Sequence, residues 1–138
     1  MNIPDRDTKV EMLNVIANKI TPNSSEYNEI VFKKSDGNVL ATMRFDLVNI
    51  DGTAGASPFL SFTINGSKFL EGVASATGRA ELFSILDKDK NYDVLSGTVG
   101  TTADISADIK FNRVDWVKKN SIELASVNIR LENVCLQK

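Results

Sequence analysis

The chain contains no histidine and only one cysteine. Without histidine, neither a Ser-His-Asp nor a Cys-His arrangement can form, and the usual general base and the commonest transition-metal ligand are both missing. A single cysteine cannot form a disulfide within the chain, and we expect Cys135, in an apolar terminal run, to be a small packed side chain. These absences exclude most enzyme classes, so we expect a non-enzymatic protein that uses no cofactor and no metal.

Long apolar runs and clusters of like charge are also missing. No window approaches the ~18 apolar residues of a membrane span, and charged residues at 5–9 occupy the place where a signal peptide would be apolar. Sixteen basic residues nearly balance eighteen acidic ones and lie singly or in pairs, whereas a phosphate backbone selects clustered cations. We therefore expect a protein of a cytosol-like compartment that binds neither membranes nor nucleic acid.

Some motifs of polar residues resemble functional sites but are incomplete. Residues 87–93 carry oxygen ligands at alternate positions, as a calcium loop does, but Tyr92 and Thr98 replace its glycine and its bidentate glutamate. We interpret this stretch as a polar turn, with weak calcium binding as the alternative. Residues 97–102 are glycine-rich but lack the lysine of a phosphate-binding loop. Carboxylate pairs for glycoside hydrolysis fall in turns and on polar strand positions, not in one predicted cleft.

The first periodic segment predicts a helix over about residues 8–20. Its start carries the capping-box pattern of Thr8 and Glu11, and Pro22 ends it. A helix of this length is marginal alone, so its apolar face must dock on its own sheet or on a neighbouring subunit. The candidate protein-contact residues on that face are Val10, Leu13, Ile16 and Ile20.

Beyond residue 28 the apolar period changes to two, which predicts strands. Turn signals at 34–38, at Asn65-Gly66 and at 87–91 predict hairpins. After the first turn, the alternation predicts an inward row of Val39, Ala41, Met43, Phe45 and Leu47. In the last strand the phase slips by one residue, which predicts a β-bulge near Ala125.

These patterns predict a mainly β fold, an antiparallel β-sandwich or barrel of seven to eight short strands with one N-terminal α-helix. A chain of 138 residues fits a single domain. We therefore expect one domain over residues 1–138, with its β region at about 29–136.

Two stretches resemble a recurring block in short structural proteins of tailed-bacteriophage virions. They are residues 72–86, GVASATGRAELFSIL, and residues 93–105, DVLSGTVGTTADI. In that block an Ala-Thr-Gly segment precedes a strand, and a Gly-Thr-Val-Gly-Thr segment leads into Ala-Asp and an alternating strand. The chain departs from the pattern at Asn112–Asn120, which holds Trp116 where such proteins have a short turn. Trp116 therefore joins the candidate protein-contact residues.

The resemblance implies a non-enzymatic virion protein assembled in the host cytoplasm, with a capsid decoration or cement protein as the first expectation. Its partners would be the major capsid protein or other virion proteins, and it would form a homo-oligomer, with a trimer as the guess. The helix and the loop at 51–57 are the expected gripping elements. The alternatives are a head-to-tail or tail-associated virion protein and a carbohydrate-binding host-attachment β-sandwich.

Overall fold

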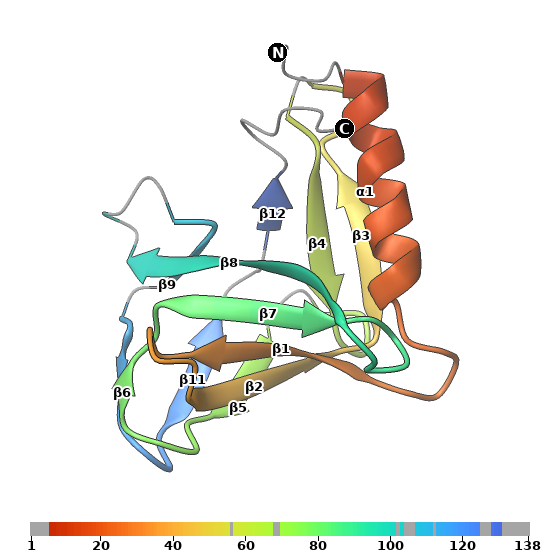
Figure 1. The fold of residues 1–138 in the computed structure, drawn as a ribbon. Coiled ribbons are helices and arrows are strands. Elements are labelled where there is room, and N and C mark those ends of the chain that lie inside the picture. The colour runs from red at the N-terminus through yellow and green to blue at the C-terminus, as the bar shows by residue number, and fades with distance from the viewer. Residues whose placement is uncertain are drawn as a thin grey trace.

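The computed structural model describes residues 6–55, 57–67, 70–101, 103, 107–111, 113–124 and 128–130. Within these residues one helix, α1 (Arg6–Ile20), precedes twelve short strands (Figure 1). The strands are β1 (Asn28–Lys33), β2 (Val39–Phe45), β3 (Leu47–Asp51), β4 (Phe59–Thr63), β5 (Leu70–Val73), β6 (Gly78–Arg79), β7 (Leu82–Leu86), β8 (Asp93–Thr101), β9 (Ile109–Phe111), β10 (Asp115–Trp116), β11 (Ser121–Leu124) and β12 (Asn128–Arg130). The prediction of a mainly β fold with one N-terminal helix is confirmed.

The largest sheet has the order β2-β1-β7-β8-β9 and curls like half of a barrel (Figure 1). Its pairs are antiparallel except for β8 and β9, which run parallel. The hairpins β1–β2 and β7–β8 are those that the polar turns at 34–38 and 87–91 predicted. Local turn chemistry therefore sets the centre of this sheet.

The chain passes directly from a strand of one sheet into a strand of the next sheet at two places. β2 pairs with β1, the chain bends at Asp46, and β3 then pairs with β4. At the bend, the Asp46 N–H donates to the Thr63 carbonyl at 2.9 Å. In the same way β4 and β5 flank the turn Ile64–Ser67 and pair with β12 and β11. The chain thus passes from one sheet to the next without leaving the extended conformation for long.

This bend corrects the predicted inward row of side chains. Ala41, Met43 and Phe45 are buried as expected, but Val39 and Leu47 are 45% and 46% exposed. Val39 begins β2, and Leu47 follows the bend, after which the buried position moves to Val48. A change of sheet resets which face is inward, so alternation across residue 46 gave a wrong prediction for Leu47.

The turn at Asn65-Gly66 forms as predicted, but it does not join two paired strands. Asn65 and Gly66 have φ values of 51° and 82°, and Ile64 and Ser67 exchange both backbone hydrogen bonds at 2.9 Å. β5 nevertheless pairs with β11 instead of returning along β4. The turn therefore connects two consecutive strands that pair with other strands and not with each other. The predicted β-bulge near Ala125 lies outside the described residues.

Helix α1 packs on its own protein, against β3, β4 and β8. Leu13, Ala17 and Ile20 recur at helical spacing and are buried. The helix ends as predicted, because the Thr21 hydroxyl and N–H both donate to the Ala17 carbonyl, at 2.6 and 2.9 Å, before Pro22. It begins at Arg6, so Thr8 lies within its first turn and is not the cap that the sequence predicted. Within the described residues, no helix has the length and apolar character needed to cross a bilayer.

Two glycines occupy positions where another part of the chain approaches the backbone too closely for a side chain. A Cβ added to Gly72 in β5 would lie 2.6 Å from the Thr42 carbonyl oxygen of β2. A Cβ on Gly97 in β8 would overlap the Asp108 carboxylate and lie 2.8 Å from the Phe83 ring. That carboxylate accepts hydrogen bonds from the Thr98 N–H and hydroxyl, at 3.0 and 3.2 Å. Both positions therefore need a residue without a side chain.

Candidate interaction surface

The structure does not bring the five candidate contact residues into one exposed surface. Leu13 and Ile20 are fully buried, and Ile16 is partly buried against the same core. Val10 is partly buried and, with Asp7 and Glu11 of α1, lines a hollow of about 440 Å³. Thr53 and Ala54 complete that lining, so the two expected gripping elements, the helix and the 51–57 loop, lie beside each other.

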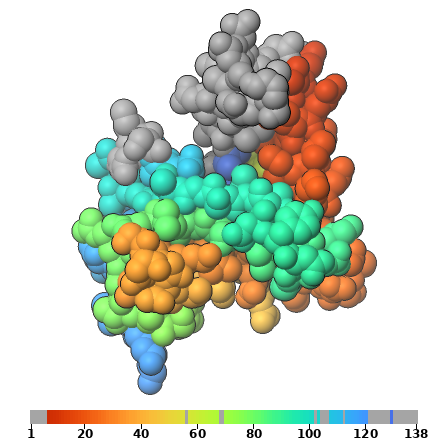
Figure 2. Space-filling model, in the orientation of Figure 1, coloured from red at the N-terminus to blue at the C-terminus, as the bar shows by residue number. Residues whose placement is uncertain are grey.

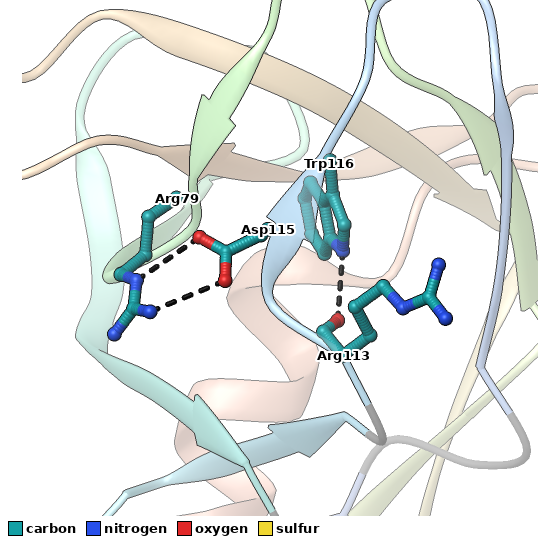
Figure 3. A network of polar contacts seen from close by, with 4 residues as sticks. All are labelled: Arg79, Arg113, Asp115 and Trp116. Carbon is teal, nitrogen blue, oxygen red and sulfur yellow. Dashed lines mark hydrogen bonds and ion pairs between the residues drawn. The ribbon is translucent and has the colours of Figure 1, made fainter.

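Trp116 belongs to the segment at 112–120, where the sequence departs from the phage block, and its side chain lies in the core. Its side chain is 6% exposed and meets Phe32 and Phe111 edge to face, with ring centroids 5.6 and 5.0 Å apart. Its indole N–H donates to the Arg113 carbonyl at 2.9 Å (Figure 3). Trp116 thus anchors the 112–120 segment from within and leaves the contact surface to its exposed neighbours.

A second attachment of this segment is an exposed ion pair. Arg79 of β6 donates through Nε and Nη2 to the two carboxylate oxygens of Asp115, at 3.1 and 3.2 Å (Figure 3). The hydrogen bonds that Arg79 donates to Asp115 raise the pKa of Arg79, and the negative charge of Asp115 adds to the effect. β10 and β6 also pair through their backbones. The pair fixes the direction of β10 as it leads into the next turn.

The backbone of the turn at residues 117–120 is fixed by hydrogen bonds, while the side chains of Val117, Lys118 and Lys119 extend into solvent. The Lys118 N–H donates to the Thr77 hydroxyl at 3.0 Å, and the Lys119 N–H donates to the Ala74 carbonyl at 2.7 Å. Lys119 has a φ of 75°, which is uncommon for a residue other than glycine. Val117 is 54% exposed, and Lys118 and Lys119 are exposed without an ion pair to any described residue. Figure 2 shows this 117–120 turn as a blue projection at the lower edge of the molecule.

At the other end of the five-stranded sheet, turns from distant parts of the chain meet (Figure 1). They carry the remaining non-glycine residues with positive φ, namely Ser25 at 69°, Asn65 at 51° and Lys90 at 62°. Residues Pro22–Tyr27, Asp46, Leu47 and Asn65 line a hollow of about 390 Å³, and we call this surface the Tyr27 face. Backbone strain of this kind gathers at sites where a surface must keep one shape.

The Tyr27 face is fixed from several sides. The Asp46 carboxylate accepts the Asn65 N–H at 3.0 Å, which holds the Ile64–Ser67 turn against the bend. The Lys90 Nζ donates to the Tyr27 carbonyl at 3.4 Å, which ties in the β7–β8 turn. The Arg44 guanidinium stacks over the Tyr27 ring, 5.7 Å from its centroid. A surface held in this way loses little conformational entropy when a partner binds.

The β7–β8 turn is ordered by Asp87. Its buried carboxylate accepts hydrogen bonds from the backbone N–H groups of Asp89, Asn91 and Tyr92. Burial alone raises the pKa of Asp87, but these donors outweigh burial and lower it. The carboxylate thus faces its own backbone, and no three His, Cys, Asp or Glu side chains in the described chain gather as a metal site would require.

The chemistry of the Tyr27 face is amphipathic and acidic. Tyr27 and Leu47 are 43% and 46% exposed, so large apolar groups stand in solvent. The two charged residues of its lining, Glu26 and Asp46, are both acidic. Next to it, Glu29, Thr42, Arg44, Ile64 and Glu71 line a further hollow of about 390 Å³. Apolar walls beside carboxylates suit a side chain with an aliphatic stem and a cationic end.

Sequence reasoning did not find the Tyr27 face. Its residues come from separate turns, and Leu47 was predicted to point inward. The available signals were the turn residues themselves, Pro22-Asn23 and Asn65-Gly66. The positive φ of Ser25 and Lys90 has no counterpart in the sequence pattern.

Roles for these residues therefore rest on their own geometry and on the resemblance of residues 72–105 to the phage block. In the structure the described residues of the two resembling stretches form the end of β5, all of β6 and β7, and β8. No protein-family model, curated protein or solved structure matches the chain.

Proposed function

We propose that this protein is a non-enzymatic structural protein of a tailed-bacteriophage virion, a capsid decoration or cement protein that stabilises the head through protein–protein contacts. It would assemble in the host cytoplasm and become part of the virion. Its partners are the major capsid protein and further copies of itself.

The observation that carries the proposal is the place of the block's small residues in the fold. Gly72 and Gly97 belong to the two stretches that resemble the phage block, and both stand where a Cβ would collide with neighbouring atoms. Ala74, between them in the chain, is buried and binds the 117–120 turn through its carbonyl. The resemblance thus involves residues at which neighbouring segments of the fold approach most closely, and such positions support a shared fold more than a shared composition would.

Surfaces outside the block supply what a cement protein needs. The Tyr27 face and the 117–120 turn both expose apolar and charged side chains on rigid backbone. A protein–protein interface gains affinity when the side chains that form it are already held in their bound positions, and it needs no catalytic group.

Co-sedimentation with empty phage capsids tests the proposal. We expect the purified chain to sediment with capsids at a saturating, lattice-defined ratio and to raise the temperature at which the capsids open. The 51–57 loop offers a contact variant, Thr53→Arg with Ala54→Arg, which leaves the core unchanged because both side chains are exposed. Failure of the unmodified chain to bind capsids would contradict a capsid role.

The same experiment separates the alternatives. Binding to purified tails or to connector complexes, without binding to capsids, would favour a head-to-tail or tail-associated protein. Retention on immobilised glycans, lost in a variant with Tyr27→Ala and Tyr92→Ala, would favour a carbohydrate-binding attachment protein, since both tyrosines are exposed.

A further inference from the structure

We propose that copies of this chain associate head to tail, with the 117–120 turn of one copy docked in the hollow of the Tyr27 face of the next. The inference deepens the proposed function and rests on it for the biological role of the assembly. The association itself is a property of the purified chain.

Charge complementarity identifies the occupant of the hollow. The charged residues that line it are carboxylates, Glu26 and Asp46, while the 117–120 turn carries two exposed lysines. Neither Lys118 nor Lys119 forms an ion pair with a described residue of its own chain. The hollow therefore supplies two carboxylates, beside the Arg44 and Lys90 cations that already contact Tyr27, and the turn supplies two ammonium groups.

The apolar parts of the two surfaces also match. Val117 is 54% exposed beside the lysines, and Tyr27 and Leu47 are 43% and 46% exposed beside the carboxylates. A lysine stem can lie on the ring and the leucine while its ammonium group reaches a carboxylate. The projecting shape of the turn (Figure 2) and the hollow of about 390 Å³ allow this insertion.

The positions of the two surfaces determine the type of assembly. The Tyr27 face lies where α1 leads into β1, and the 117–120 turn lies beyond β6 at the other end of the five-stranded sheet (Figure 1). Different patches on opposite ends of one molecule form a heterologous interface, which closes into a ring or grows into a filament. Both surfaces are also rigid, since Asp46 and Lys90 hold one and Thr77 and Ala74 hold the other.

Sedimentation velocity of the full chain over a range of concentrations tests the inference. We expect species larger than the 15.1 kDa monomer at low ionic strength, with an affinity that falls as salt is added. Lys118→Glu with Lys119→Glu should weaken association at least about tenfold. Glu26→Lys with Leu47→Lys should do the same from the other side of the interface.

A matched control reverses two basic residues elsewhere. Lys110→Glu with Arg113→Glu makes the same change in net charge at two exposed positions that belong to neither surface, and should leave association unchanged. Circular dichroism should give the same spectrum for all three double variants.

Mixing the two interface variants gives a positive result that misfolding cannot imitate. Each variant keeps one intact surface, so the mixture should associate more tightly than either variant alone. A monomeric unmodified chain at every concentration, or no association in the mixture, would overturn the inference. If the unmodified chain is monomeric and Glu26→Lys with Leu47→Lys loses capsid binding, the hollow takes a segment of the capsid protein and not a second copy. Self-association without capsid binding would remove the proposed function and leave the inference standing.

Discussion

At the scale of single residues, one buried amide joins the helix to the main sheet. Asn28 is 1% exposed, and its Nδ2 donates to the carbonyls of Ile20 and Leu86 at 2.9 and 3.0 Å. Its Oδ1 accepts the N–H of Glu29 at 2.8 Å. Every polar atom of this side chain is therefore used, and it satisfies a carbonyl at the end of α1 that the helix leaves free.

We expect Asn28→Asp to lower the free energy of unfolding by about 2–3 kcal/mol, since the new side chain cannot donate to either carbonyl. Urea denaturation followed by circular dichroism measures the change. Asn18→Asp makes the same chemical change at an exposed position of α1 and should alter stability by less than about 0.5 kcal/mol. Equal effects of the two variants would show that the Asn28 hydrogen bonds contribute little.

Asp87 predicts an acid-dependent part of stability. Its folded pKa is lowered below the ordinary value of 3.8, so the ionised form is favoured in the folded state. Asp87 therefore stabilises the fold at pH above 3.8, and this contribution is lost as the pH falls below that value through the folded pKa.

Asp87→Asn should be less stable than the unmodified chain at pH 7, and the difference should shrink as the pH is lowered below 3.8. Thermal melts between neutral and strongly acidic pH measure it. Asp93→Asn, at the exposed start of β8 directly after the same turn, should have little effect at neutral pH. A difference for Asp87→Asn that is constant with pH would contradict the assignment.

At the scale of elements, the sequence predicted what is local. The helix end at Pro22, the β1–β2 and β7–β8 hairpins and the Asn65-Gly66 turn follow from residues that are neighbours in the chain. The pairings of β4 with β12 and of β5 with β11 join residues far apart, and no local pattern specifies them. The Tyr27 face likewise brings together residues 22–27, 46–47 and 65, which are separate in the chain, so no local pattern predicted it.

Glycine positions test the packing of β5 on β2. Gly72→Ala should destabilise the protein by about 1–3 kcal/mol, because its Cβ would lie 2.6 Å from a backbone oxygen that cannot move independently. Gly97→Ala should have a similar effect through the Asp108 carboxylate. Gly55→Ala is the control, since a Cβ there would be 3.9 Å from its nearest neighbour. Denaturant midpoints of the three variants give the comparison, and a neutral Gly72→Ala would mean that the strands can separate at no penalty.

At the scale of the whole molecule, consecutive strands of the chain belong to different sheets, so we expect the sheets to unfold together. β2 of the five-stranded sheet is followed through Asp46 by β3 of the three-stranded sheet, and β4 of that sheet is followed after the Ile64–Ser67 turn by β5 of the β5–β11 sheet. Trp116 is buried in the core at one corner and is the only tryptophan of the chain. Its fluorescence therefore reports on the core around Phe32 and Phe111.

We expect one cooperative transition, with Trp116 fluorescence and far-ultraviolet circular dichroism giving the same midpoint in urea. Two separate midpoints would indicate that the β6–β10 corner unfolds independently of the main sheet. Arg79→Lys with Asp115→Asn provides a comparison, because loss of an exposed ion pair should leave the two midpoints coincident.

The pairing of β4 and β5 with β12 and β11 also bears on how the chain folds during synthesis. β4 has a first neighbour in β3, but its second neighbour, β12, and the partner of β5, β11, are made only when residues 121–130 are translated. Until those residues leave the ribosomal tunnel, a middle strand of the native protein is a bare edge on the nascent chain, open to wrong partners. Completion of the fold is therefore a late event. On a ribosome paused before residue 121, the nascent chain would still lack β11 and β12, the partners of β5 and β4.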